Sequence, residues 1–297
     1  MTAIDFEALL AEELAKSLGS SEQKSEKENG KEVVAKTANE SLEHYLSENN
    51  EKTKQNKKAK KMKLSNDYKL KSPIGSTYYI RNYITPTEES DIMEKIMDSR
   101  VKNEWVQLKR RKLLCFGEKA KQSKGNEKKK ESELAMAKWC ELLIDKICND
   151  SEIFDEHHRP NHILINNYEI GEGIMAHKDG PAYYPLVCIL SLHSAITILF
   201  FQKPPVVRKS EDGHSLIQLK PNPVLQVILE PRSLFIFRDD LYHHYYHMIL
   251  EADNDVIFDT CVNHNLTFPT FSVGDVLPRK QKRVSITIRH FYYQDTD

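Results

Sequence analysis

Three consecutive residues in the middle of the chain, His177, Lys178 and Asp179, include side chains suited to metal chemistry. They follow a β-rich run and a turn, and on an extended segment residues i and i+2 point to the same side. The imidazole and the carboxylate can therefore reach one ion. With a second histidine they would form the two-histidine, one-carboxylate ligand set that suits non-haem Fe(II). An H-x-D pair alone is weak evidence, because such pairs also occur by chance in polar loops.

The segment from Asp240 to His247 contains three histidines that could supply the third ligand. If this segment is extended, His243, Tyr245 and His247 share one face, and His244 lies on the other. Geometry does not choose between the faces, and on the first face it leaves both His243 and His247. The ordinary alternative for His243 and His244 is that they are half-exposed strand residues.

The last β-rich run alternates polar and apolar side chains. Its polar face would carry Arg283, Ser285, Thr287 and Arg289. The Cα atoms of the two arginines would be roughly 20 Å apart at about 3.3 Å per residue. Two inward-leaning guanidinium groups could flank a small dianion such as a dicarboxylic acid, since guanidinium and carboxylate pair bidentately. A solvent-facing polar edge is the ordinary alternative.

The elements that must position these residues are mostly short strands. Runs of β-branched and aromatic residues separated by turns predict strands at His162–Ile170, Leu186–Leu192, Ala195–Phe201, Ser215–Leu219, Val224–Leu229, Ser233–Phe237, His243–Leu250 and Val284–Tyr293. About eight such strands with little helix between them predict a jelly-roll or barrel. Upstream, we expect a strand at Thr77–Ile84, a helix from Thr85 to about Ser99 and a helix over Glu133–Cys148. The predicted fold class is therefore α+β, mainly β.

The N-terminal part of the chain has a different composition. From Ser20 to about Lys63 it is rich in Ser, Glu, Asn and Lys, and it has too few apolar residues to offset its ordering entropy. We therefore divide the 297 residues into a mostly disordered, charged extension, 1–67, and a folded domain, 68–297. Within the extension, Asp5–Leu18 is expected to form a short amphipathic helix. It is either a marginal helix in a tail or a helix that docks on a protein partner.

Charge, cysteines and hydropathy limit the class of protein. The formal net charge of -1 says nothing about partners. The seven lysines between Lys52 and Lys63 could serve nuclear import or phosphate contact, and the ordinary alternative is a solvated tail. Five cysteines without a C-x-x-C pair indicate reduced thiols. The acidic N-terminus is unlike a signal peptide, and no apolar run has the length of a membrane span. We expect a soluble monomer of the nucleus and cytoplasm.

The order of the motifs resembles the AlkB family of dioxygenases, over roughly Tyr78 to Phe291. The matching pieces are Asn166-Asn167-Tyr168, Gly171, His177-Lys178-Asp179, Tyr246-His247-Met248-Ile249 and the strand from Arg283 to Arg289. The Tyr-His-x-Ile context selects His247 as the third ligand. The stretch Asp179–Pro185, with Trp105 and Arg111-Lys112-Leu113 upstream, is most similar to the sixth AlkB homologue subgroup. Two departures are Ser285, where several members carry Asn, and the long stretch between His247 and Arg283, which we expect to be an external loop.

The resemblance implies a double-stranded β-helix with packed helices. It implies Fe(2+) as the cofactor, held by His177, Asp179 and His247, with 2-oxoglutarate and O2 as cosubstrates. The cosubstrate residues it implies are Asn166 and Tyr168 as hydrogen-bond partners, Arg283 at the distal carboxylate of 2-oxoglutarate, and Arg289 near its metal-side carboxylate and Asp179. The implied reaction is hydroxylation of a C–H bond, after which an N-methyl group is lost as formaldehyde.

The substrate is the part of the function that the sequence constrains least. Trp105 with the basic run that includes Arg111 and Lys112 could form a lid that stacks a base and contacts phosphates; Tyr183 and Tyr184 are further candidates. The ordinary alternative is a charged surface helix-loop with the tryptophan in the core. We expect demethylation of an alkylated base in RNA or DNA. The alternatives are a demethylase or hydroxylase of a protein side chain such as methyl-lysine, a non-catalytic nucleic-acid-binding module on the same fold, and a jelly-roll metalloenzyme that uses no 2-oxo acid.

Overall fold

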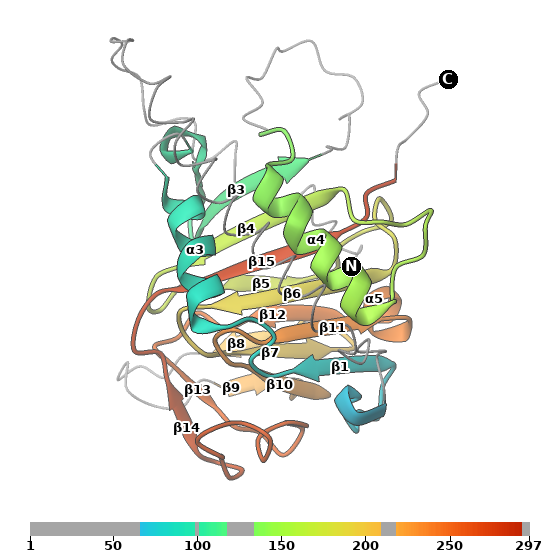
Figure 1. Ribbon diagram of the computed structural model, residues 1–297. Coiled ribbons are helices and arrows are strands. Elements are labelled where there is room, and N and C mark those ends of the chain that lie inside the picture. Colours follow the sequence, from blue (N-terminus) through green and yellow to red (C-terminus); the bar gives the residue numbers. More distant parts are fainter. Residues whose placement is uncertain (1–65, 99–100, 118–133, 209–217, 293–297) are drawn as a thin grey trace, which may run out of the picture.

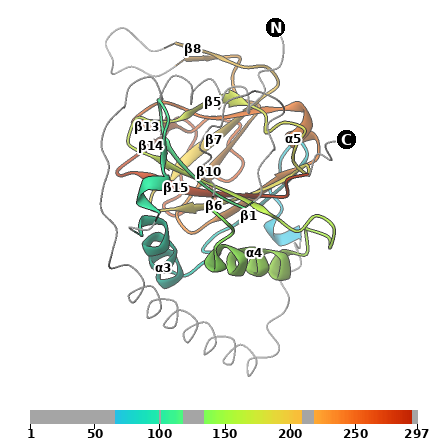
Figure 2. The same cartoon turned by 90° about the horizontal axis from the view of Figure 1, so that it is seen from above.

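The computed structural model describes residues 66–98, 101–117, 134–208 and 218–292. The described residues do not include the predicted helix Asp5–Leu18, the predicted disordered stretch or the lysine cluster. In the described part, a seven-stranded sheet and a four-stranded sheet face each other. Two helices cover the outer face of the larger sheet (Figure 1, Figure 2).

The larger sheet has the strand order β1-β11-β6-β15-β4-β3-β2. Its strands are β1 (Ser76–Ile80), β2 (Val106–Gln107), β3 (Lys112–Gly117), β4 (His162–Tyr168), β6 (Leu186–Leu192), β11 (Leu234–Arg238) and β15 (Arg283–Arg289). Every neighbouring pair is antiparallel. The strand that carries both predicted cosubstrate arginines, β15, lies at the centre of this sheet and pairs with β4, which carries Asn166 and Tyr168.

The smaller sheet has the order β10-β7-β12-β5 and is also antiparallel. Its strands are β5 (Ile174–His177), β7 (Ile196–Phe201), β10 (Leu225–Leu229) and β12 (Tyr246–Ile249). Two ribbons complete the set, β8 (Val206–Arg208) with β9 (Gln218–Lys220), and β13 (Asn254–Val256) with β14 (Val276–Pro278). Two facing antiparallel sheets form the predicted jelly-roll, the double-stranded β-helix.

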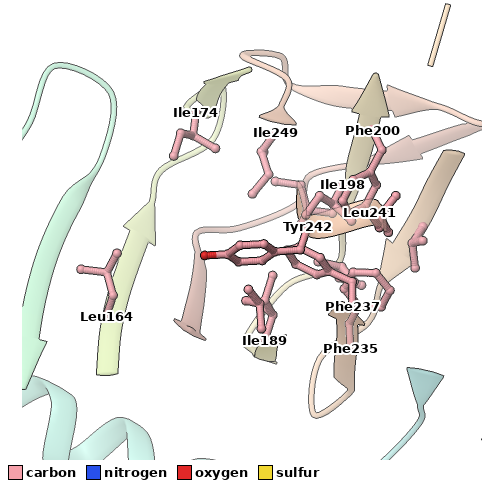
Figure 3. Close-up of a cluster of buried hydrophobic side chains, with 14 of the residues drawn as sticks. Leu164, Ile174, Ile189, Ile198, Phe200, Phe235, Phe237, Leu241, Tyr242 and Ile249 are labelled. Carbon is pink, nitrogen blue, oxygen red and sulfur yellow. The ribbon is translucent and has the colours of Figure 1, made fainter. Parts of the chain in front are cut away.

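Two apolar clusters hold the three layers together. Between the sheets, residues of both point toward one another, including Leu164, Ile189 and Phe235 from the larger sheet and Ile198 and Ile249 from the smaller (Figure 3). The second cluster lies between the larger sheet and the helices α3 (Pro86–Met97) and α4 (Lys138–Ser151), and includes Ile96, Ile144, Ile165 and Ile286. Because side chains alternate along β15, its isoleucines and valine face the helices while its polar residues face the interior between the sheets.

The helix predictions hold with shifted starts. Thr85 is the N-cap of α3, and its side chain forms a capping box with Glu88. The second helix begins at Lys138 rather than Glu133, because Leu134 forms a β-bridge with Phe116 and its carbonyl accepts from Gly117 N–H. The alternative of a charged surface helix-loop with Trp105 in the core is correct for the tryptophan, which packs against the core, but not for the helix. A short 3-10 turn, Lys102–Glu104, is followed there by the β2–β3 hairpin. Another 3-10 turn, Asn66–Tyr68, precedes β1.

Two further predictions need correction. The expected strand His243–Leu250 begins only at Tyr246, because Asp240–His244 forms the short helix α5. The stretch between His247 and Arg283 is not simply an external loop. Its Asn263 is fully buried, and its amide bonds both backbone groups of Ile228 in β10 at 2.8 Å. In the part of the chain that the structure describes, no helix has the length and hydropathy needed to cross a membrane.

Candidate active site

The predicted metal ligands come together where β5 and β12 pair. His177 stands directly opposite His247 in this register, and their ring centroids are 4.2 Å apart. The two strands approach closely because Gly173 precedes β5; a Cβ there would stand only 2.4 Å from the Ile249 carbonyl oxygen. Asp179 lies just beyond β5, with Oδ1 at 3.8 Å from His177 Nε2 and 3.6 Å from His247 Nε2. All three residues are buried, and their ligand atoms lie within 4.8 Å of one another, as a single ion would require.

The structure decides the choice of histidine that strand geometry left open. His243 and His244 are on the short helix α5 and are exposed, so neither shares a strand face with His247. Among the described residues, the group formed by His177, Asp179 and His247 is the one that meets the geometric requirements of a metal site. The third ligand is therefore His247, as the family context predicted.

The electrostatics of these residues favour the forms that bind a cation. Burial lowers the pKa of His177, and the neighbouring His247 lowers it further; burial also lowers the pKa of His247. Burial raises the pKa of Asp179, but the combined effect of Arg289, His247 and His177, with the hydrogen bond from Arg289, outweighs burial and lowers this pKa. The Met175 carbonyl lies 2.8 Å from His177 Nδ1 and can accept a hydrogen bond from Nδ1–H, which leaves Nε2 with a lone pair for a metal ion.

The three ligands line a pocket between the two sheets. Its other polar side chains are Asn166, Tyr168, Arg283, Ser285, Thr287 and Arg289, and its apolar lining includes Leu164, Ile174, Val187, Ile189, Ile198, Leu229 and Ile249. The alternating polar face of β15 therefore faces the pocket and is not a solvent-exposed edge. All four predicted cosubstrate residues share this pocket with the metal ligands.

Arg283 is a buried cation with unused hydrogen-bond donors. Its side chain is 3% exposed, and Nη2 donates to Ser191 Oγ at 2.9 Å. Its Nε and Nη1 have no hydrogen-bond partner among the described residues. Burial lowers its pKa to about 10, which still leaves the guanidinium charged at neutral pH. A buried charge is costly unless it is paired, so these donors fit an anion such as the distal carboxylate of 2-oxoglutarate.

Arg289 has a different set of contacts. Its Nη1 forms an ion pair with Asp179 Oδ2 at 3.1 Å, and its guanidinium carbon lies 3.8 Å from the centre of the Tyr183 ring. Nη2 is 3.5 Å from His162 Nδ1. Arg289 thus lies at Asp179, as predicted, and holds that carboxylate ionised beside the metal position.

The structure brings together only part of the predicted substrate set. Tyr183 is buried against Arg289, but Trp105 and Tyr184 pack against the helix-side cluster of the larger sheet, away from the pocket. Arg111 is buried, and its Nε donates to Asn166 Oδ1 at 3.1 Å. Lys112 is exposed on β3. Whether any of them contacts a substrate stays a prediction.

One residue of the site was missed from the sequence. Ser191 is fully buried in β6, where its hydroxyl accepts from Arg283. The available signal was a lone hydroxyl in the apolar strand Leu186–Leu192, since a polar group in a strand buried on both faces needs a partner.

Comparisons with known proteins show the family of this chain. A family model described as the 2OG-Fe(II) oxygenase superfamily matches residues 76–289, a range that contains the three metal ligands and both pocket arginines. The chain belongs to this superfamily. A Danio rerio protein named "Probable RNA/DNA demethylase ALKBH6" is 32% identical over 223 residues, which cover 75% of this chain and 88% of the relative. The chain is therefore an AlkB-like member of the superfamily.

Two further matches are more distant. "Uncharacterized protein L905" of Acanthamoeba polyphaga mimivirus is 27% identical over 235 residues, 76% of this chain and 91% of the relative. Among solved structures, "The structure of OsALKBH1" aligns over 73% of this chain and 99% of that chain, with 13% identity and a TM-score of 0.42. The fold assignment rests on the sheet topology described above. The chain is a dioxygenase whose residues fit Fe(II) and 2-oxoglutarate.

Proposed function

We propose that this dioxygenase demethylates an alkylated base in RNA or DNA. The observation that carries the proposal is the intact ligand set of His177, Asp179 and His247 in one pocket with the buried Arg283, in a chain similar over three quarters of its length to a relative named as a probable RNA/DNA demethylase. Without the ligand set, the fold could serve only as a binding module. Without Arg283, the distal carboxylate of 2-oxoglutarate would lack this buried cationic partner in the pocket.

Each group of pocket residues would have a separate role in the reaction. His177, Asp179 and His247 would hold Fe(II), and Arg283 would bind the distal carboxylate of 2-oxoglutarate, assisted by Asn166 and Tyr168. When bound, Fe(II) with 2-oxoglutarate and O2 supplies the oxidation that hydroxylates an N-methyl group, which then leaves as formaldehyde. Arg289 keeps the Asp179 carboxylate ionised, and the apolar lining excludes water from the reacting groups.

A base in a duplex cannot enter a pocket between two sheets, so the substrate base would be single-stranded or flipped out of its stack. The β2–β3 hairpin carries two exposed lysines, Lys109 in the turn and Lys112 at the start of β3. Arg110 of the same run forms an ion pair with Glu251, and Arg111 is buried, so the two lysines are the members of the run best placed for phosphate contact.

The test is removal of methyl groups from defined substrates. Purified protein with Fe(II), ascorbate and 2-oxoglutarate is given RNA and DNA oligonucleotides with N-methylated bases, and methyl-lysine peptides for comparison. Mass spectrometry should show loss of methyl from a nucleic acid, with formaldehyde, and no loss with His177→Ala. Turnover of peptides but not of any oligonucleotide would contradict the proposal and favour the protein-substrate alternative.

A second measurement addresses the lysines. Replacing Lys109 and Lys112 by Ala should weaken binding of RNA or DNA and lower the slope of log K against log salt by about 2. The matched control is Lys220→Ala, an exposed lysine on β9. Unchanged affinity and slope in the double variant would remove the lysines from the interface.

Residence in the nucleus and cytoplasm stays a prediction.

A further inference from the structure

Arg111 has surroundings unlike those of its neighbours in the basic run. Lys109 and Lys112 are exposed, whereas the Arg111 side chain is 1% exposed. Its Nε donates a buried hydrogen bond to Asn166 Oδ1 at 3.1 Å. Asn166 lines the pocket that contains the metal ligands and Arg283. Arg111 is therefore buried against Asn166, a residue that lines the pocket, and is not on the exposed surface.

The backbone holds Arg111 in this position. The Arg111 carbonyl accepts from Leu108 N–H at 2.9 Å, which closes the turn between β2 and β3, and Leu108 is buried in the cluster between the sheets. Arg110 forms an ion pair with Glu251, just after β12. β2 is an edge strand of the larger sheet and β12 belongs to the smaller one. The ion pair therefore connects the β2–β3 turn to the smaller sheet.

The hydrogen bond also decides which way the Asn166 amide faces. A carboxamide has an oxygen that only accepts and an amino group that only donates, and a half-turn of the side chain exchanges them. An arginine N–H can bond only the oxygen, so the amino group of Asn166 is turned away from Arg111. Toward an anion in the pocket the amino group can donate, whereas the oxygen would repel it.

We propose that Arg111 is a positioning residue for 2-oxoglutarate: its Nε–H fixes the Asn166 carboxamide with the amino group toward the bound cosubstrate. The role is independent of the nucleic-acid substrate proposed above, since it concerns only the binding of 2-oxoglutarate.

The test compares two replacements whose side chains reach as far as the Nε atom of Arg111. Arg111→Met places a methyl where Nε stands, and Arg111→Gln places an amide N–H at the same number of bonds from Cα. The affinity for 2-oxoglutarate is measured by calorimetry on the Mn(II)-loaded full chain without turnover. We expect roughly tenfold weaker binding for Arg111→Met and recovery of most of this loss by Arg111→Gln. The control, Lys220→Met, removes an exposed charge on β9 and should bind 2-oxoglutarate like the wild type.

A double-mutant cycle shows whether Arg111 acts through Asn166. In the Asn166→Ala background, Arg111→Met should cause no further loss of affinity. In turnover with excess metal, Arg111→Met should raise KM for 2-oxoglutarate by a similar factor and leave kcat within about twofold of the wild type.

Three results would overturn the proposal: wild-type affinity in Arg111→Met, equal weakening in Arg111→Met and Arg111→Gln, or a full tenfold loss from Arg111→Met in the Asn166→Ala background. Melting curves accompany each variant. If Arg111→Met does not fold, Arg111→Lys replaces it, because it keeps the charge but places a methylene where Nε stands. Loss of the fold in both would show that Arg111 supports the fold and not the orientation of Asn166, and would equally overturn the proposal.

Discussion

His177 and His247 meet because of strand register. They are opposite one another in the β5–β12 pair, and a slip of one residue would turn His247 to the outer face of the smaller sheet. Spacing in the sequence indicated that His177 and Asp179 share one side, and alternation indicated the same for Arg283 and Arg289. The order of the family motifs was needed to predict a metal site from these residues. Periodicity could not separate His243 from His247, because the short helix α5 removes His243 from the strand.

The assignment of the third ligand can be tested with a matched pair of histidines. Loss of a residue that only hydrogen-bonds a metal ligand typically weakens metal binding by about 10–100-fold. His247→Ala removes a ligand itself, so we expect a larger loss of Mn(II) affinity. His243→Ala removes an exposed imidazole four residues away and should bind Mn(II) like the wild type. Calorimetry measures both. Equal effects of the two variants would show that the third ligand is wrongly assigned.

The pH dependence of metal binding follows from the shifted pKa values. Metal binding needs neutral imidazoles and an ionised carboxylate, and the pKa values of His177, His247 and Asp179 are all lowered. The neutral histidines therefore persist below the ordinary histidine pKa of about 6.5. We expect Mn(II) affinity to be flat from about pH 7.5 to about pH 6 and to fall only at lower pH. A tenfold fall between pH 7 and 6 would contradict the lowered histidine pKa values.

At the scale of elements, strands and helices with strong periodicity could be predicted to within a few residues, as Leu186–Leu192 and α3 show. β5 was missed because its four residues follow a glycine-rich turn and alternate weakly. The stretch after β12 was predicted to be an external loop because the contacts that hold it in place come from residues distant in the sequence. Asn263 bonds β10, and Asp255 pairs with Arg279; local sequence shows neither contact.

The Asp255–Arg279 ion pair should be important for stability. Both side chains are almost fully buried, and the two groups form hydrogen bonds of 2.8 and 3.0 Å. Asp255→Ala leaves a buried guanidinium without its counter-charge, so we expect a loss of about 3–5 kcal/mol in the free energy of unfolding. Denaturant titration measures it. Arg159→Ala, which breaks exposed ion pairs with Glu141 and Asp145, is the control and should cost less than about 1 kcal/mol. Similar losses in both variants would mean that burial of the pair does not matter.

At the scale of the whole molecule, the layers explain why the pocket lies where it does. Helices α3 and α4 cover only the outer face of the larger sheet (Figure 2), so the polar face of β15 is left for the space between the sheets. The jelly-roll could be predicted from the number of short strands, but the partner of each strand could not. Pairing of distant strands, such as β1 with β11, depends on which apolar faces meet.

We expect residues 66–297 to fold without the first 65 residues, as the predicted division of the chain implies. A fragment of residues 66–297 contains every strand of both sheets and all pocket residues. We expect it to melt cooperatively and to turn over 2-oxoglutarate at a rate within about threefold of the full chain. Scanning calorimetry and succinate formation measure these properties. A fragment that does not fold would show that the extension contributes to the core.

The central claim is that His177, Asp179 and His247 form the metal site of a 2-oxoglutarate-dependent dioxygenase, with Arg283 holding the cosubstrate. The most direct measurement is succinate formed from 2-oxoglutarate by the purified full chain with Fe(II), ascorbate and O2. We predict succinate formation by the wild type, its loss with His177→Ala, and a raised KM for 2-oxoglutarate with Arg283→Met. Absence of both succinate and metal binding in the wild type, or wild-type turnover in His177→Ala, would contradict the account.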